Sequence, residues 1–420
     1  MGNVTTENIS STLEASTAIP NRQDMDANSL CIVCLSDLFW DEHWSSEQQI
    51  MSRLAEKCRV LYVERPVSIF SSLTGVSDSS VMRQWLRWLR GGIRQEGANL
   101  TVLSPVPVLP LRYNRFVNKI NSWLLRRSVK RGLSKAGFQS PVLWIYSPDA
   151  GKLVGTLGEC YSVYYCADDW AASKQWWNDG RQVRARETEL AAKVDLVVGT
   201  STNIVKRWQQ SHANTMLVTN GADVESFKAA RDPELKLPDD LQNIPSPRIG
   251  YVGCVDSRFD SALYLELAER RPDWNFVIVG PLSGTNLKLA SLKQRKNVHF
   301  LGSRNRAELP AYLKGFDVCT IPYVCDTLAK SIFPLKFFEY LSAGRPIVST
   351  ALPELAPYSR YVHIAHDADV FENSLQASLT NPLPSASDSF LAQNSWEAKA
   401  EHLWETLEQA VPHVAVKGTC

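Results

Sequence analysis

The chain has 420 residues, with 45 Lys or Arg against 44 Asp or Glu, and its formal net charge is +1. Hydrophobic residues make up 44% of it and charged residues 21%, a globular balance that excludes a disordered chain, a collagen-like repeat and a disulfide-rich miniprotein. At roughly 100–200 residues per domain, this length predicts two or three domains, and most simply two. A net charge near zero argues against a dedicated nucleic-acid-binding protein, which usually carries a basic excess.

The N-terminal stretch and the cysteines bear on the compartment. Residues 1–29 are polar and lack the apolar core of a signal peptide, so we expect a disordered leader there. No apolar run approaches the roughly 20 residues that span a bilayer. Cys31 and Cys34 lie in an apolar run that predicts a buried strand, and the nine cysteines show no framework spacing. We therefore expect free thiols and a cytoplasmic protein.

From Leu30 onward, short apolar runs alternate with helical patterns in two series. Several runs are continuously apolar, as strands are in a parallel sheet that helices cover on both faces. The alternation predicts an α/β protein with two doubly wound, Rossmann-like domains, and the cleft between them is the default ligand site. The predicted strands are Leu30–Leu35, Arg59–Glu64, Leu100–Val106, Val142–Tyr146, Ser162–Cys166, Leu196–Thr200, Arg248–Gly253, Asn275–Gly280, Val298–Gly302, Val318–Pro322, Pro346–Thr350 and Val362–Ala365.

Composition also predicts the boundaries. Lys228 to Ser246 is polar and interrupted by prolines, which is typical of a linker. An apolar pattern that runs from Trp396 to Leu407 predicts a last helix. We expect an N-terminal domain over residues 30–225, a linker over 226–246, a C-terminal domain over 247–390, the last helix over 391–412 and a tail over 413–420.

The stretch from Lys330 to Gly344 carries the strongest chemical signal. Pro334 is predicted in the first turn of a helix, and Gly344 just past its end. The free N–H groups at a helix start can bind an anion. Lys336 adds a cation to the same turn, where the helix dipole disfavours it, and a bound phosphate would remove that conflict. A solvated Lys336 is the alternative.

Glu339 follows one turn later, between Phe338 and Tyr340. Such a carboxylate either faces solvent on the outer side of its helix or accepts hydrogen bonds from the vicinal hydroxyls of a ribose. The second use requires a phosphate site nearby.

Five segments in this order carry a resemblance to a known family: Asn220–Phe227, Arg248–Arg258, Asn297–Gly302, Pro334–Ser349 and Asn394–Trp396. They resemble motifs of the retaining glycosyltransferases of family 4, which have the GT-B fold, and in particular its teichuronic-acid and capsule-type members. The resemblance implies a nucleotide-sugar donor in the C-terminal domain, no metal or other cofactor, and a last helix that crosses back to the N-terminal domain.

The same resemblance implies roles for single residues. Glu339 would accept the ribose hydroxyls, Lys336 and Arg258 would neutralise the departing diphosphate, and Gly253 would let its loop approach the donor closely. A plain turn is the alternative role for Gly253. The full donor-binding set is Gly253, Arg258, Ser331, Pro334, Leu335, Lys336 and Glu339.

One position departs from the family pattern. The family pairs two glutamates with seven residues between them, and with Glu339 as the second, the first position is Ser331. Ser331 can hydrogen-bond a sugar or phosphate oxygen, but it is not an ionised acceptor. The donor sugar is therefore not assigned by the motif.

Acceptor-binding residues are predicted where strands of the N-terminal domain end. Asp41, His43 and Trp44 follow the first strand, and they could hold a sugar through hydrogen bonds and ring stacking. An ordinary surface histidine is the alternative for His43. Trp170 follows a later strand and is a further stacking candidate.

Asp168 and Asp169 follow that same later strand. Adjacent carboxylates point in different directions, so at most one of them lies in the site, and a helix cap is the alternative for each. The catalytic candidates are Asp168, His43, Arg258 and Lys336.

The charges are unevenly distributed. Between Val81 and Ser140 there are twelve Lys or Arg and one acid, Glu96, so this segment carries +11 and the rest of the chain −10. Within residues 81–136, basic residues alternate with Trp and Leu at helical spacing, which suits an anionic membrane surface. The alternative is a pair of ordinary amphipathic helices that pack their Leu and Trp inward.

The function predicted from these observations is transfer of a sugar from a nucleotide-sugar donor to a saccharide or lipid-linked acceptor, with retention, in polysaccharide or glycolipid biosynthesis. A GT-B sugar-nucleotide epimerase and an inactive GT-B partner subunit are the alternatives. No nucleic-acid partner is expected. We expect a cytoplasmic protein, with peripheral attachment at the inner face of the membrane as an extension.

Overall fold

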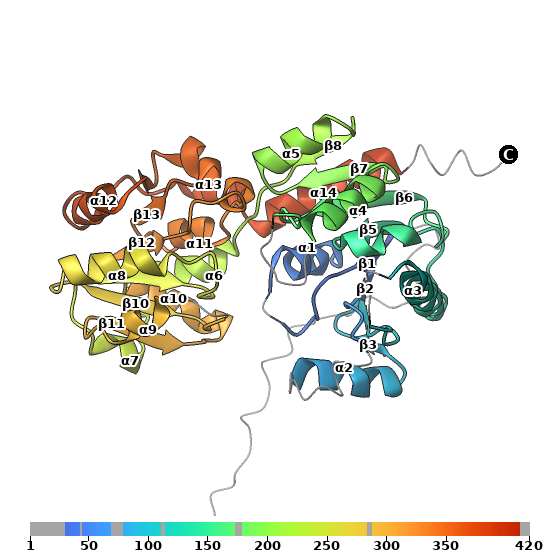
Figure 1. The fold of residues 1–420 in the computed structure, drawn as a ribbon, viewed down its shortest axis with the longest axis horizontal. Coiled ribbons are helices and arrows are strands. Elements are labelled where there is room, and N and C mark those ends of the chain that lie inside the picture. The colour runs from blue at the N-terminus through green and yellow to red at the C-terminus, as the bar shows by residue number, and fades with distance from the viewer. Residues whose placement is uncertain are drawn as a thin grey trace, which may run out of the picture.

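The computed structural model describes residues 30–42, 44–68, 79–110, 114–172, 179–283 and 288–411. It places them in two α/β domains that lie side by side (Figure 1). The expected leader and tail lie outside the described residues.

The N-terminal domain has, in the described residues, a sheet of eight strands in the order β3-β4-β2-β1-β5-β6-β7-β8. All of its pairings are parallel except that of β3 with β4. Its strands are β1 (Cys31–Leu35), β2 (Arg59–Val63), β3 (Ile93–Gln95), β4 (Leu100–Leu103), β5 (Val142–Ile145), β6 (Tyr161–Cys166), β7 (Leu196–Gly199) and β8 (Thr215–Leu217). Its helices are α1 (Ser46–Leu54), α2 (Ser79–Leu89), α3 (Arg115–Ala136), the 3₁₀ helix η1 (Pro148–Leu153), α4 (Gly180–Ala191) and α5 (Thr202–Gln209).

The C-terminal domain has, over its described residues, a parallel sheet of six strands in the order β11-β10-β9-β12-β13-β14. These strands are β9 (Arg248–Val252), β10 (Asn275–Val279), β11 (Val298–Gly302), β12 (Val318–Ile321), β13 (Ile347–Thr350) and β14 (His363–Ala365). The helices are α6 (Val224–Lys228), η2 (Ala229–Arg231), α7 (Asp239–Gln242), α8 (Ser261–Arg270), α9 (Leu289–Lys293), η3 (Arg306–Glu308), α10 (Leu309–Lys314), η4 (Ala329–Ser331), α11 (Lys336–Ser342), η5 (Pro353–Tyr358), α12 (Ala368–Thr380) and α13 (Asp388–Gln393). The last helix, α14 (Trp396–Ala410), packs on the N-terminal domain.

The predicted α/β architecture is confirmed, and every predicted strand overlaps an observed one. The continuous apolar pattern has a direct cause in β1. Ile32 and Cys34 pack into one buried cluster and Val33 and Leu35 into another, on the opposite face of the sheet. The prediction missed β3 and β8, since strands of three residues are too short to show a period.

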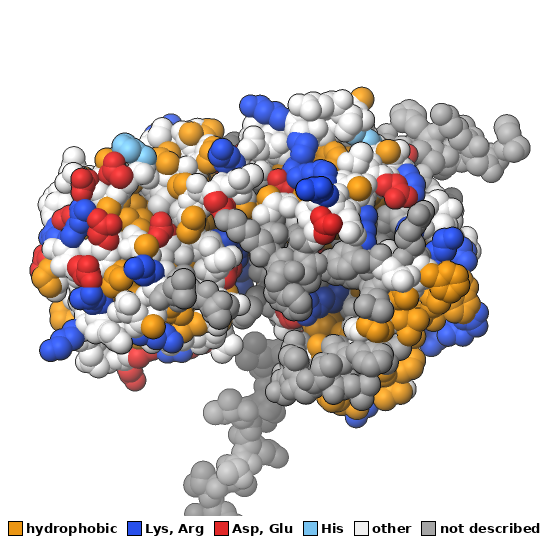
Figure 2. All heavy atoms as spheres, viewed as in Figure 1, with side chains coloured by type: hydrophobic (Ala, Val, Ile, Leu, Met, Phe, Trp, Pro, Cys, Tyr) orange, Lys and Arg blue, Asp and Glu red, His pale blue; other side chains and the backbone are white. Residues whose placement is uncertain are grey.

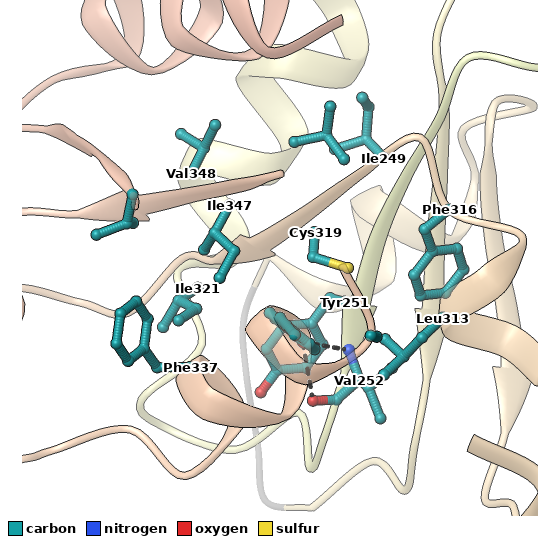
Figure 3. Close-up of a cluster of buried hydrophobic side chains, with 14 of the residues drawn as sticks. Ile249, Tyr251, Val252, Leu313, Phe316, Cys319, Ile321, Phe337, Ile347 and Val348 are labelled. Atoms are coloured by element: carbon teal, nitrogen blue, oxygen red, sulfur yellow. Dashed lines mark hydrogen bonds between the residues drawn. The ribbon is translucent and has the colours of Figure 1, made fainter. Parts of the chain in front are cut away.

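The core of the C-terminal domain fixes the helix that carries the motif residues. Phe337 of α11 packs among side chains of β9, β12 and β13, such as Ile321 and Ile347 (Figure 3). The Tyr340 hydroxyl accepts a hydrogen bond from the backbone N–H of Val252 at 2.9 Å and lies 3.3 Å from the carbonyl of the same residue. These contacts set α11 against the end of β9.

The expected linker is part of the C-terminal domain. Phe227, Ala230, Leu241 and Ile244 are buried in the core of that domain, although the segment between them is polar and rich in proline. Arg231 donates hydrogen bonds to the carbonyls of the last turn of α11, at 2.7 and 3.0 Å. The linker prediction over 226–246 is therefore wrong, because a few well-spaced apolar residues are enough to dock short helices.

The chain passes between the domains twice, and the two passages are bonded to each other. The Ala222 N–H donates to Asn394 O at 3.1 Å, and the Trp396 N–H donates to Ala222 O at 3.0 Å. The helix α14 then packs along α1 of the N-terminal domain, with Trp396 in the core of that domain (Figure 1). The last helix thus crosses back, as predicted.

The burial of Trp396 gives a stability prediction. Replacement by alanine leaves a cavity in the N-terminal core beside the crossing, so Trp396→Ala should lower the free energy of unfolding by about 3–5 kcal/mol. Calorimetry of the full chain measures it. The control is Leu217→Ala, whose side chain is largely exposed and whose loss should cost about 0.5 kcal/mol or less. Equal effects of the two changes would show that Trp396 does not anchor the helix.

Candidate functional site

The predicted donor residues gather at the carboxyl end of the C-terminal sheet. Gly253 follows β9 with φ +146°, a conformation that L-residues with a side chain rarely adopt. A Cβ at this position would lie 2.9 Å from the Nζ of Lys336. The backbone angle therefore favours glycine, and the absence of a Cβ lets the Lys336 ammonium lie against the strand end.

Lys336 opens α11 and is only 9% exposed. Its Nζ donates a hydrogen bond to the Tyr323 hydroxyl at 2.7 Å and lies 5.0 Å from the ring centroids of both Tyr251 and Tyr323. Two aromatic faces thus hold the ammonium by cation–π attraction. No carboxylate among the described residues forms an ion pair with it, so its charge is available to an anion.

A second cation joins the same group. Arg258 is held by Asp256 through several hydrogen bonds, the shortest from Nη2 at 2.6 Å, and its guanidinium carbon lies 5.9 Å from the centroid of Tyr323. Burial alone would raise the pKa of Asp256, but the hydrogen bonds and charge of Arg258 outweigh it and the pKa is lowered. Both residues therefore stay charged, and Tyr323 contacts Arg258 and Lys336 alike.

Asp168 reaches this group from the other domain. It follows β6 at the carboxyl end of the N-terminal sheet, and its pKa is raised, mainly by burial, while Arg258 opposes that shift. Asp168 in turn helps to raise the pKa of Arg258. The two charges therefore interact across the domain boundary, which distinguishes Asp168 from its neighbour Asp169.

Asp169 has a different role. It is buried and accepts hydrogen bonds from Arg184 at 2.6 Å and from Arg207 at 2.7 Å. It also accepts from the Ala172 N–H at 3.3 Å, as a cap would. Asp169 thus ties α4 and α5 to the loop after β6, in agreement with the expectation that at most one of the two aspartates is in the site.

Glu339 lies on α11, one turn after Lys336, and its side chain is 16% exposed. Burial raises its pKa, while the charges of Arg306 and Lys336 oppose the shift. One Arg306 Nη lies 3.5 Å from a Glu339 oxygen. Arg306 was missed by the sequence analysis, because it belongs to the short helix η3 and no motif marks it.

The remaining donor candidates lie just before α11. Ser331 ends η4 and is buried. The helix begins at Lys336, so Pro334 precedes it instead of lying in its first turn, and that detail of the prediction is wrong. Leu335 packs against the core of the N-terminal domain, and the side chain of Asn220 donates to Phe333 O at 2.8 Å. This loop is therefore also a contact between the domains.

The predicted acceptor residues are less closely grouped than the predicted donor residues. Asp41 is engaged by Arg87 at 2.5 Å and Arg94 at 3.7 Å, so its carboxylate is already neutralised by the basic segment. Trp44 is exposed, with its ring 5.6 Å from that of Trp40. Trp170 is half-buried, two residues after Asp168. His43 lies outside the described residues.

A buried polar cluster below this edge went unnoticed in the sequence. Glu47 of α1 accepts from Ser36, which follows β1, and Ser36 also bonds the Tyr62 hydroxyl at 2.5 Å. Burial is the main reason why the pKa of Glu47 rises to about 8. Glu64, after β2, is likewise buried and accepts from Arg94 at 2.8 Å and from Ser104 at 2.6 Å. These carboxylates brace the strand ends beneath the acceptor side.

The described part of the chain has neither a cluster of metal-ligating side chains nor a helix that could span a membrane. No group of three or more His, Cys, Asp or Glu is arranged so that it could hold a metal ion there. None of the helices in the described ranges has the length and apolar character needed to cross a bilayer.

The C-terminal domain matches the model of a known protein family. Residues 247–381 match the model of the family "Glycosyl transferases group 1", and this range contains all the donor candidates. Over 244 residues the chain is 27% identical to TuaH of Bacillus subtilis (strain 168), which is described as a teichuronic acid biosynthesis glycosyltransferase. The match covers 54% of this chain and 61% of TuaH, so the chain spans about three fifths of that relative.

Solved structures resemble the whole described chain. Sucrose-phosphate synthase from Thermosynechococcus elongatus superposes with a TM-score of 0.67 at 16% identity, covering 91% of this chain and 100% of that one. Anabaena HepE, solved with UDP and glucose, gives 0.62 at 13% identity, with coverages of 90% and 99%. At such identities the likeness concerns the fold. The chain thus has the GT-B fold, and residues 247–381 of its C-terminal domain match the model of the group 1 glycosyl transferases.

Proposed function

We propose that this chain is a nucleotide-sugar-dependent glycosyltransferase. It would transfer a sugar, with retention, to a saccharide or lipid-linked acceptor in polysaccharide or glycolipid biosynthesis. The main support for this proposal is a pair of cations, Lys336 and Arg258, which both lie next to Tyr323. They lie beside Gly253, where strands end in the domain that matches the group 1 model. Two positive charges at the carboxyl end of a parallel sheet suit a diphosphate.

The structural relatives support this choice of donor. HepE was solved with UDP and glucose, and an Escherichia coli structure with a TM-score of 0.65 at 13% identity was solved with UDP-2-fluoro glucose. TuaH is described as a glycosyltransferase of teichuronic acid biosynthesis, which supports a polysaccharide product. The base and the sugar of the donor are left open by this proposal.

The proposed reaction breaks the bond between the anomeric carbon and a phosphate oxygen. The electron pair of that bond stays on the diphosphate, where Lys336 and Arg258 neutralise it, and this stabilisation is worth a few kcal/mol for each well-placed donor. The acceptor oxygen forms the new bond to the anomeric carbon, and its proton passes to the departing diphosphate. Asp168, opposite Arg258, would stabilise the positive charge that develops on the sugar.

The other donor residues orient the substrate. Glu339 would accept the two ribose hydroxyls, and Arg306 at 3.5 Å would hold the carboxylate in place and oppose its protonation. Ser331 would donate to an oxygen of the sugar or the diphosphate. In this proposal the cations do the work of a metal, and no cofactor takes part. We place the protein in the cytoplasm, at the membrane face where lipid-linked acceptors are exposed.

A ligand panel tests donor binding. Nucleoside diphosphates and their sugars are added to the full chain, and unfolding is followed by thermal shift. A ligand at about 100 times its dissociation constant should stabilise the protein by roughly 2.7 kcal/mol. No stabilisation by any nucleotide would contradict the proposal. Turnover of the bound donor without an acceptor would favour an epimerase, and binding without any turnover a partner subunit.

A charge removal tests the diphosphate site. Lys336→Gln keeps most of the side-chain volume but loses the ammonium between the two tyrosines, so kcat should fall by about 10²-fold or more. The matched control is Lys296→Gln, an exposed lysine after α9, which should leave the rate unchanged. If both variants turn over like the parent protein, Lys336 does not contact the leaving group.

The pKa of Asp168 predicts a pH dependence. Because burial raises it, the folded site binds a proton above the ordinary pKa of an aspartate, and the charged form that the reaction needs is lost as the pH falls through that raised value. The acid limb of kcat/KM should therefore lie above about pH 4, and Asp168→Asn should be slow and lack this limb. The control is Asp369→Asn, at an exposed aspartate. An unchanged limb in Asp168→Asn would remove Asp168 from the site.

A further inference from the structure

The exposed apolar side chains of this protein are concentrated on two helices. Among the described residues, nine large hydrophobic side chains are exposed, and six of them lie on α2 and α3. These six and the cations beside them form what we call the basic–apolar face. It comprises Met82, Arg83, Leu86 and Leu89 of α2, Arg90 directly after that helix, and Phe116, Lys119, Ile120, Trp123, Arg126, Arg127, Lys130, Arg131 and Lys135 of α3.

The helix α2 is inverted relative to a helix that packs an ordinary core. Its polar Gln84 points inward and donates to Arg65 O at 2.7 Å, and Arg87 reaches Asp41 at 2.5 Å. Leu86 and Leu89 point outward and are 46% and 67% exposed. Exposed apolar side chains that gather on one helix mark a site for a further apolar or amphipathic partner.

The helix α3 presents the same combination. Phe116, Ile120 and Trp123 recur at intervals of four and three residues, which places them on one side of the helix. Phe116 is 75% and Trp123 50% exposed, while Val129 and Leu133 of the opposite side are buried. The alternative in which both helices pack all their Leu and Trp inward is therefore wrong.

In the part of the chain that the structure describes, the cations of α3 have no ion-pair partner. This helix of 22 residues contains no acid, and within the described chain none of its exposed lysines and arginines from Lys119 to Lys135 forms an ion pair. Arg126, Arg127, Lys130 and Arg131 surround one hollow beside Trp123. Like charges this close repel each other unless anions lie between them.

The two helices form one continuous surface. A hollow of about 360 Å³ is lined by Trp88 and Leu89 at the end of α2 and by Arg131 and Lys135 of α3. Figure 2 shows hydrophobic side chains bordered by basic ones over this part of the N-terminal domain. In Figure 1, α3 lies on the side of that domain that faces away from the C-terminal domain, so the face does not compete with the donor site.

We infer that the basic–apolar face binds an anionic lipid bilayer. At an interface, leucine, phenylalanine and tryptophan enter the boundary between headgroups and acyl chains, while lysine and arginine stay at the level of the phosphates. The length of α3, roughly 33 Å, lies in the membrane plane. The apolar side chains by themselves would suit any apolar partner. The cations around them, which form no ion pair within the described residues, favour a surface of fixed negative charge.

This inference rests on the proposed function only in that a membrane would supply a lipid-linked acceptor. Its test is co-sedimentation of the full chain with vesicles of phosphatidylcholine, alone or mixed with phosphatidylglycerol. We expect binding to the mixed vesicles at low salt, weaker binding at high salt, and little binding to neutral vesicles. Donor binding by thermal shift is measured on the same samples.

Two pairs of variants locate the face. Arg126→Gln with Lys130→Gln should weaken binding about 25-fold, at about fivefold per charge, whereas Lys293→Gln with Lys296→Gln makes the same change in net charge elsewhere and should leave it unchanged. Leu89→Ser should weaken binding about fivefold or more, and its control Leu217→Ser should not. Unfolding curves confirm that each variant is folded.

The outcomes separate the two proposals. Vesicle binding that is absent in the parent protein, or equal in the face variants and their controls, overturns the inference. So does a homodimer of the parent protein that Leu89→Ser dissociates, because the face would then bind a second copy. Vesicle binding without any nucleotide binding supports the face and contradicts the proposed donor chemistry. Nucleotide binding without vesicle binding does the reverse.

Discussion

The pair of backbone hydrogen bonds between Ala222 and the residues Asn394 and Trp396 is the constraint on which the rest of the structure depends. It ties the two passages between the domains to one point, where Gly221 leaves only 3.0–3.1 Å between a Cβ position and the neighbouring backbone. These bonds fix both passages, so the relative position of the two domains is set there.

A second set of contacts joins the two domains. Glu354 of the C-terminal domain accepts from the Thr202 N–H at 3.0 Å and the Asn203 N–H at 3.3 Å, where its charge also suits the start of α5. The Asn203 side chain donates to Lys330 O at 2.9 Å. These bonds hold the loop before α11, which places Ser331 and Lys336 at the boundary with Asp168 of the other domain.

The buried cation of the site lowers the stability of the folded protein. Lys336 is nearly buried and is compensated by two aromatic rings and one hydroxyl, whereas Arg258 is partly exposed and interacts with Asp256 and Asp168. A buried cation with incomplete compensation, such as Lys336, weakens folding but gains from an anion that completes the compensation. The arrangement therefore favours an anionic ligand over water, without rearrangement of either side chain.

The sequence predicted what depends on local patterns and missed what depends on docking. Parallel strands are recognisable because both of their faces are buried, and Gly253 and Lys336 because glycine and charge stand at a strand end and a helix start. The role of Phe227 and Leu241 was hidden by prolines, although these two residues suffice to join the supposed linker to the core. Arg306 and the engagement of Asp41 by Arg87 arise from contacts between distant segments, which no single-chain pattern displays.

The basic segment shows why net charge alone predicts little about partners. Its +11 divides according to where each side chain points. Arg87 and Arg94 turn inward and neutralise Asp41 and Glu64, so they serve the fold of the acceptor side. The cations of α3 turn outward beside exposed phenylalanine and tryptophan, where none of the described acidic residues forms an ion pair with them. Basic residues of one segment thus pair with carboxylates of the acceptor side and, on our inference, also form a membrane-binding face. The structure distinguishes the two by whether a carboxylate lies within reach.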